Sequence, residues 1–199
     1  MKANASGGVS RPSPFLPFNH NLHCYTLSLL IRIGAEGETR AGAGMDRLAE
    51  AKRMVDAFTN VGADRFDLTH THLSGESRGF RRSQTPAQIH TSLPYLLDSA
   101  PRRQNNIILR PHSSSARLIQ LDDLSADVME TVKPLSFLTL ATSPGSYQAW
   151  IAVEDADADF ARRLRKGTGA DISASGAVRL AGSHNFKPKY APTFPVVTI

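Results

Sequence analysis

The chain has 199 residues, of which 41% are hydrophobic and 21% charged, and its formal net charge at pH 7 is +5. This length and composition are typical of one globular domain with a substantial core, and they exclude an intrinsically disordered protein. The single cysteine, Cys24, excludes an internal disulfide and a zinc ribbon, and no apolar run approaches the roughly 20 residues of a membrane helix, so we expect a cytoplasmic protein without a membrane partner.

The first 44 residues differ in composition from the rest of the chain. Residues 1–21 are rich in Gly, Ser, Pro and Asn without any period, which is typical of disordered or loosely packed segments. Residues 25–33 suit a short strand or a helical turn, and a glycine-rich stretch then leads to Met45. We therefore divide the chain into a poorly structured extension, 1–44, and a globular domain, 45–199.

The globular part opens with a strongly patterned segment. Residues 46–61 carry their apolar side chains on one stripe, with Asp46 as a cap and Gly62 as a stop, and so predict a helix. Alternation in "DRFDLTHTHL", 64–73, predicts a strand, and residues 77–82 are its candidate hairpin partner.

A second helical segment and two apolar runs follow. Residues 85–100 predict a helix, or two short ones, with Pro86 in the first turn and Pro94 as a candidate break. The β-leaning runs "NIILRP", 106–111, and "RLIQL", 117–121, are separated by a short polar stretch. They are candidates for neighbouring antiparallel strands.

The next elements are a short helix and a hairpin. Ser125 can cap a helix over residues 125–133. The runs 135–143 and 147–153 flank "PGS", which is the pattern of two strands joined by a tight turn.

The C-terminal part starts with another helix. Residues 155–169 are acidic at their start and basic at their end, which matches the helix dipole, with Gly167 beyond the helix. The final stretch, 175–199, is rich in turn residues, and we expect it to wrap the surface before a last strand. The order of elements predicts an α+β fold with a mixed, largely antiparallel sheet and flanking helices.

Charge is unevenly distributed along the second half. Residues 119–159 hold eight acids and one base, Lys133, whereas residues 160–199 hold seven Lys or Arg and one acid, Asp171. An acidic cluster beside a basic segment suits a site where cations meet a polyanion such as nucleic acid, although two solvated faces of opposite sign would look the same.

The adjacent acids Asp122 and Asp123 stand where an apolar run ends. Neighbouring residues on an extended strand point to opposite faces, so both carboxylates reach one metal only if the strand ends or bends there. We expect the strand to stop at Leu121, because Ser125 begins a helix. Such a pair suits a hard cation, which prefers oxygen ligands, but two polar residues ahead of a helix are the alternative.

Two further segments are candidate sites. "TSPGSYQAW", 142–150, places a Pro-Gly turn beside hydrogen-bonding side chains that suit a phosphate or a base, unless it is an ordinary hairpin. In 169–190, Asp171 lies among basic residues and is either a third metal ligand or half of a salt bridge. Gly176 and Gly182 would permit close backbone approach there.

His70 and His72 form a third candidate, because residues two apart on a strand share one face. A metal held by this pair would make the protein a nickase of the relaxase type. Thr71 fits the middle position of such a motif poorly, and exposed surface histidines are the alternative.

Five segments, taken in this order, resemble the RepB-like primase domain of mobilisable plasmids, which is sometimes fused to relaxases. They are "GADRFDL", "NNIILRP", "IQLDDL", "TSPGSYQAW" and "DISASGAVRLAGSHNFKPKY". The resemblance covers roughly residues 46–199, and the hairpin segment and "RLAG" with the Asn and Lys that follow it are its most specific parts. This family is similar to the archaeo-eukaryotic primases.

The resemblance implies an α+β core in which Asp122, Asp123 and Asp171 bind Mg²⁺ or Mn²⁺ and act in catalysis. It implies primer synthesis from nucleoside triphosphates on single-stranded plasmid DNA, during replication or conjugative mobilisation. The residues expected to bind nucleotide are Ser143, Tyr147, Gln148 and Arg179. Those expected to bind DNA or phosphate are Asn185, Lys187 and Lys189.

Gln148 stands where the wider primase superfamily leads us to expect a histidine. In the family, a helical domain follows the catalytic one and helps to recognise a single-stranded origin, so a separate helical domain or a relaxase is a candidate partner. The main alternative function is a non-catalytic module of a plasmid mobilisation protein that binds single-stranded DNA.

Overall fold

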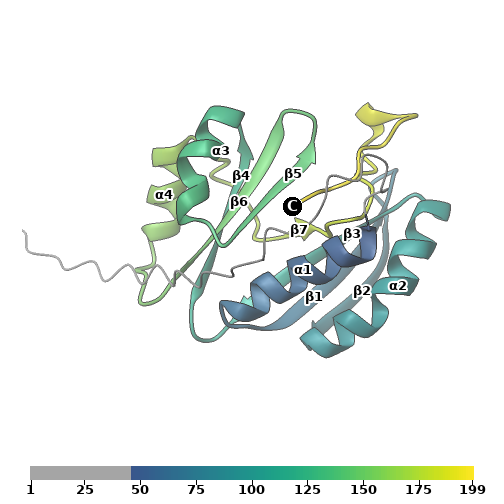
Figure 1. Cartoon of the computed structure of the whole chain (residues 1–199), viewed down its shortest axis with the longest axis horizontal. Helices are drawn as coiled ribbons and strands as arrows, with labels where there is room; N and C mark the ends of the chain where they lie inside the picture. The colour runs from purple at the N-terminus through teal and green to yellow at the C-terminus, as the bar shows by residue number, and fades with distance from the viewer. Residues whose placement is uncertain (1–45) are drawn as a thin grey trace, which may run out of the picture. The chain divides into compact units, whose positions relative to one another are not determined.

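The computed structural model describes residues 46–199 (Figure 1). The expectations for residues 1–44 therefore lie outside the described residues. The helices, strands and 3₁₀ turns are α1 (Arg47–Asn60), β1 (Ala63–His72), β2 (Ser77–Gln84), α2 (Pro86–Arg102), β3 (Asn105–Ser113), β4 (Arg117–Leu124), α3 (Ala126–Val132), η1 (Lys133–Leu135), β5 (Leu138–Ser143), β6 (Ser146–Val153), α4 (Phe160–Thr168), β7 (Val178–Arg179) and η2 (Pro188–Tyr190).

The strands form two antiparallel sheets, which confirms the α+β class. One sheet has the order β2-β1-β3-β7 and the other the order β4-β6-β5. The expected pairing of residues 106–111 with 117–121 is wrong, because β3 and β4 belong to different sheets. Both edges of β3 are already occupied, one by β1 and the other by β7, so β4 pairs with β6 instead.

Local signals set most helix ends. The Asp46 carboxylate accepts hydrogen bonds from two backbone N–H groups of the first turn of α1, and the Ser125 hydroxyl accepts one, from Val128 N, in α3. Helix α2 begins in a capping box at Thr85 and runs unbroken through Pro94, so the predicted break is wrong. Burial of its apolar side against the core compensates for the hydrogen bond that the proline cannot donate.

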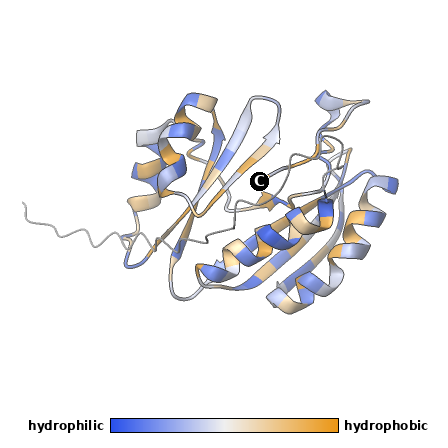
Figure 2. Cartoon of the chain, in the orientation of Figure 1, coloured by the Kyte–Doolittle hydropathy of each residue, from blue (hydrophilic) through white to orange (hydrophobic). Residues whose placement is uncertain are grey.

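Two apolar cores lie on opposite faces of the three-stranded sheet. The larger contains the buried sides of α1 and α2, the covered face of the four-stranded sheet and Trp150. Its centre is Phe58, whose ring packs edge-to-face on Phe66, Phe137 and Trp150. The smaller core joins β4 and β6 to α3 and α4. Figure 2 shows hydrophobic and hydrophilic residues alternating along α1 and α2, as amphipathic helices require.

The C-terminal part differs from two expectations. Helix α4 extends through Gly167, and Gly169, with a φ of 71°, is its left-handed C-cap. The stretch from β7 to Phe186 is largely buried, so it does not wrap the surface as predicted. It is drawn inward because β7 pairs with β3 and because Gly182 and Ser183 exchange backbone hydrogen bonds with Val197.

Within the described part of the chain, no helix has the length and apolar character needed to cross a membrane.

Candidate functional site

Asp122 and Asp123 lie on a bulge within β4. The strand continues to Leu124, so the expected stop at Leu121 is wrong. Leu121 pairs with Ala149 and Leu124 with Tyr147, and the two aspartates therefore stand opposite one residue, Gln148. Asp123 adopts a φ of 59°, in the left-handed region that Asp tolerates better than most residues. The extra residue re-aims its side chain, which a regular strand would point away.

Contacts with β6 show that both carboxylates lie on one side of the sheet. Gln148 Nε2 donates to Asp122 Oδ1 at 2.7 Å, and Ser146 Oγ donates to Asp123 Oδ1 at 3.4 Å. Ser146 and Gln148 are two residues apart on β6 and so project from the same face. The bend that the sequence required is present, and a bulge supplies it.

Asp122 is the more constrained of the two acids. It is half-buried, and its Oδ1 also accepts from the backbone N–H of Asp123 at 2.8 Å. Gln148 is buried, and its Oε1 has no hydrogen-bond partner among residues 46–199. The amide nitrogen is thus held by Asp122, while the amide oxygen is a buried acceptor that no residue of the described domain satisfies.

The backbone of Asp171 lies beside this bulge. Its N–H donates to the carbonyl of Asp122 at 3.0 Å. Its carboxylate is bound to its own loop, accepting from Ser173 Oγ at 2.7 Å and from Ser173 N at 2.8 Å. These hydrogen bonds lower the pKa of Asp171 below its ordinary value.

The structure therefore brings the three acids together at the backbone but does not converge their carboxylates. No group of three or more His, Cys, Asp or Glu side chains in residues 46–199 is arranged to hold a metal ion. A cation at this site would rest first on Asp122 and Asp123, whose oxygens are ligands that Mg²⁺ and Mn²⁺ accept.

Arg179 on β7 lies close enough to Asp122 for the two opposite charges to interact. Burial lowers the pKa of its guanidinium, whereas the negative charge of Asp122 acts to raise it. Its Nε donates to Asn106 Oδ1 at 3.1 Å. That same oxygen accepts from Phe186 N at 2.9 Å, so a buried amide on β3 positions the guanidinium.

Two residues that hold parts of this site in place were not predicted from the sequence. Asn106 appeared only as the polar start of an apolar run. Gln120, buried in β4, donates to Ala177 O and accepts from Gly176 N, both at 2.8 Å. It ties β4 to the segment that joins Asp171 to Arg179. The signal available in the sequence was a polar residue within an apolar strand pattern, since such a residue needs hydrogen-bond partners if it is buried.

The other predicted nucleotide-binding residues are more dispersed. Ser143 is buried and accepts from the hydroxyl of Tyr190 at 2.7 Å. Tyr147 packs on the smaller core, on the face of β6 opposite to Gln148. The structure therefore places Gln148 and Arg179 near Asp122 and does not bring Tyr147 to them.

The predicted phosphate-binding residues follow β7. Asn185 is buried, and its Nδ2 donates to Thr142 O at 2.9 Å, which fastens the C-terminal segment to β5. Lys187 and Lys189 are exposed, and Lys189 Nζ lies 4.9 Å from the ring centre of Tyr190. The two lysines can reach a polyanion from solvent, whereas Asn185 serves the fold.

His70 and His72 occupy alternate positions of β1, as predicted, but their surroundings disfavour a cation. Burial and the nearby charges of Arg81 and Arg103 lower the pKa of His70. His72 Nδ1 lies 2.8 Å from Ser74 Oγ. Positive neighbours would repel a metal ion, so the geometry gives no support to a nickase site here.

Comparison with solved structures agrees with the fold described above. No family model matches the sequence, and no curated protein is significantly similar to it. Two solved structures match: primase RepB′, with a TM-score of 0.64, and the catalytic domain of primase RepB′ in complex with initiator DNA, with a TM-score of 0.63. Each is 27% identical over 76% of this chain, which spans 55% of the first structure and 82% of the second. The chain has the fold of a RepB′ primase catalytic domain, and the predicted resemblance is confirmed.

Proposed function

We propose that residues 46–199 form a primase catalytic domain that joins nucleotides on a single-stranded DNA template. The observation that carries this proposal is the β4 bulge, which turns two adjacent carboxylates toward one face with Arg179 nearby. The fold similarity adds to it, because the solved catalytic domain is bound to initiator DNA.

A divalent cation, Mg²⁺ or Mn²⁺, fits the donor set of the bulge. Asp122 Oδ1 is occupied by two hydrogen bonds, and no described residue hydrogen-bonds Oδ2, which stays available. Asp123 is exposed and has one long hydrogen bond. Asp171 can add a third carboxylate if its side chain turns away from Ser173. The metal would neutralise triphosphate charge and favour attack by the primer 3′-hydroxyl.

The protein's own residues then bind and orient the substrates. Arg179 offers its two terminal nitrogens to phosphate oxygens of a nucleoside triphosphate, because Asn106 fixes its Nε. Gln148 keeps Asp122 in one orientation, a positioning role in place of the direct nucleotide contact we expected. Lys187 and Lys189 bind template phosphates from the exposed segment. A separate helical domain or a relaxase is the partner we propose for origin recognition.

One observation favours the alternative, a non-catalytic module that binds single-stranded DNA. The Asp171 carboxylate is hydrogen-bonded by Ser173. Among the described residues, the side chains of Asp122, Asp123 and Asp171 do not form a metal-binding cluster. Such a module would keep the fold and bind DNA without joining nucleotides.

The deciding experiment measures metal-dependent incorporation of labelled nucleotides on a single-stranded template. Asp122→Ala and Asp123→Ala should each abolish synthesis and leave DNA binding largely intact. Asp127→Asn, which changes an exposed acid in the first turn of α3, is the matched control and should be active. Synthesis that survives both alanine changes would overturn the metal-site assignment. DNA binding by the unaltered chain without any synthesis would favour the alternative.

A further inference from the structure

A row of four residues crosses the whole four-stranded sheet. Phe80 on β2 pairs with Thr69 on β1, and Thr69 pairs with Ile108 on β3. Ile108 in turn pairs with Arg179 on β7. Directly paired residues project from the same face of a sheet, so the row runs along one face from the outer edge to Arg179. Three strand spacings span about 14 Å.

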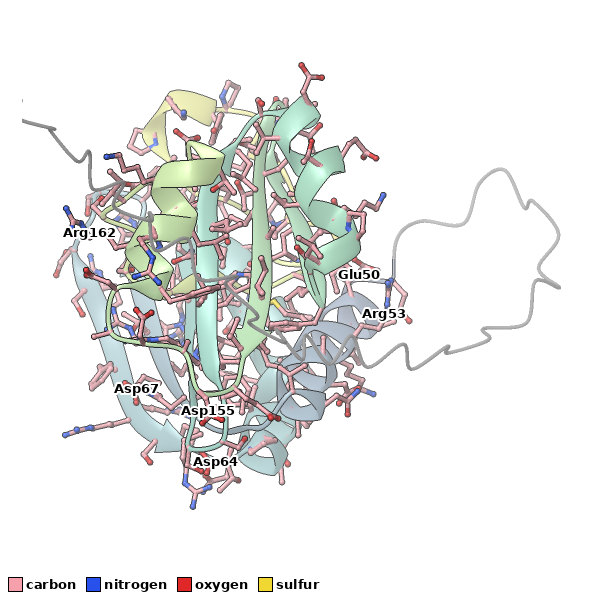
Figure 3. All side chains as sticks on the ribbon, turned by 90° about the vertical axis from the view of Figure 1, so that its left-hand side faces the viewer. Glu50, Arg53, Asp64, Asp67, Asp155 and Arg162 are labelled. Atoms are coloured by element: carbon pink, nitrogen blue, oxygen red, sulfur yellow. The ribbon has the colours of Figure 1, made fainter. Side chains whose placement is uncertain are left out.

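This face is the one that the helices leave open. Leu68, Ile107 and Leu109, which alternate with the row on β1 and β3, are buried in the core with α1 and α2. Phe80 is 59% exposed, while Thr69 and Ile108 are partly exposed. Figure 3 shows Asp67, which alternates with Leu68, on the opposite side of the molecule from Glu50 and Arg53 of α1.

Basic side chains flank the row. Arg110 lies opposite Asp67 in the β1–β3 pairing, and Arg82 is close enough to Asp67 to lower the pKa of that carboxyl. Both arginines are exposed, and neither forms an ion pair with any residue of the described domain. Asp67 accepts from Ser83 N at 2.8 Å and lies 3.0 Å from the ring of His112, which reduces its repulsion of an anion.

We propose that the single-stranded template lies across this open face, with one base stacked on Phe80 and its backbone phosphates on Arg82 and Arg110. This proposal rests on the proposed function, because a DNA strand that follows the row reaches Arg179 and thereby the nucleotide-joining site. An exposed aromatic ring flanked by guanidinium groups suits single-stranded nucleic acid, since every base has a stacking face that duplex DNA hides. Between the two ends of the row, the DNA strand would pass over the partly exposed, uncharged side chains of Ile108 and Thr69.

The test is binding of a fluorescent oligonucleotide by anisotropy, with chelator present and without nucleotides. Phe80→Ala should weaken binding to single-stranded DNA about ten-fold and change binding to duplex DNA little, whereas Phe80→Trp should restore it. Tyr95→Ala is the matched control: Tyr95 is 58% exposed but lies on α2, on the covered side of the sheet. It should bind like the unaltered protein.

The arginines give a second, independent readout. Arg82→Gln and Arg110→Gln should each weaken binding and reduce the slope of log affinity against log salt by about one. Arg81→Gln is the control, because Arg81 pairs with Leu68 and so projects from the other face. It should change the slope less.

The outcomes separate this path from the proposed catalysis. Binding that depends on Phe80 in a protein without synthesis would support the path and reject the catalytic function. Equal binding by the Phe80→Ala and Tyr95→Ala variants would overturn the path, whether or not synthesis occurs. A change in oligomeric state with unchanged DNA affinity would also overturn it, since Phe80 would then be a protein contact. A photocrosslinking residue at position 80 should attach to single-stranded DNA, and one at position 95 should not.

Discussion

Gln148 donates its side-chain amide to Asp122 at 2.7 Å from the position on β6 that faces both aspartates of the β4 bulge. The bulge and the glutamine therefore form one unit. The bulge turns the second carboxylate to the face of the first, and the amide fixes how the first is oriented. Because Gln148 is buried, it can hold that orientation without competition from solvent.

Replacing Gln148 tests this positioning role. Gln148→Ala removes a hydrogen bond to a charged group, which is worth about 1.5–3 kcal/mol, so nucleotide incorporation should fall roughly 10- to 150-fold. The apparent affinity for template should stay unchanged, since the amide acts on Asp122. Steady-state kinetics separates the two effects. A loss confined to template affinity would show instead that Gln148 contacts DNA.

The left-handed backbone of Asp123 gives a stability prediction. Asp123→Val forces a β-branched residue into this region and should lower the free energy of unfolding by about 1–2 kcal/mol. Asp123→Gly removes the same carboxylate without that strain and should unfold near the temperature of the unaltered protein. Thermal unfolding followed by circular dichroism measures the difference. Equal melting temperatures for the two variants would mean that the bulge relaxes.

We expect Asn106 to contribute both to the stability of the domain and to the position of the Arg179 guanidinium. Asn106→Ala leaves Phe186 N–H and Arg179 Nε without their acceptor, at a cost of about 2 kcal/mol or more. The variant should melt at a lower temperature and bind nucleoside triphosphate more weakly. Isothermal titration with nucleotide checks the second effect. Asn106→Asp keeps the acceptor for Arg179 but loses the Nδ2 donor to Thr71 O and Phe186 O. It should therefore also melt at a lower temperature, while it retains nucleotide binding better than Asn106→Ala.

Gly182 packs directly on the backbone of α1. A Cβ at this position would lie 2.1 Å from Arg47 O, and its φ is 77°. Gly182→Ala should therefore lower the free energy of unfolding by about 3 kcal/mol and the melting temperature by roughly 6–12 °C.

Two other glycines calibrate that result. Gly145→Ala meets no atom within 4 Å but has a φ of 72°, so it should cost only about 1 kcal/mol. Gly167→Ala, in open space inside α4, should stabilise the protein by up to about 1 kcal/mol. A Gly182→Ala variant no less stable than the Gly145→Ala variant would contradict the close contact with Arg47.

The Asp171–Ser173 contact has a definite pH dependence. Its hydrogen bonds lower the pKa of Asp171 in the folded state, so they stabilise the loop above the ordinary aspartate pKa. That contribution is lost as the pH falls through the lowered pKa. Ser173→Ala removes the hydroxyl donor and should raise the pKa of Asp171 toward its ordinary value. Carbon-13 NMR titration of the carboxyl groups measures this, and an unchanged pKa would show that the backbone N–H alone sustains the shift.

The sequence by itself determined the local elements and the chemistry available. Asp46 and Ser125 mark helix starts, and "PGS" marks the β5–β6 turn, because caps and tight turns depend on a few neighbouring residues. The sequence also showed which acids are adjacent and required a bend between them.

Only the tertiary structure decided what lies beside those acids. The separation of β3 from β4, the bulge opposite Gln148 and the hydrogen bond that Arg179 donates to Asn106 depend on pairings between distant strands. Each strand edge can pair with several other strands of the domain, so the local sequence pattern does not predict which pairing forms. The rotation of Asp171 toward Ser173 is likewise a choice among side-chain conformers, set by the hydrogen bonds available in the folded loop.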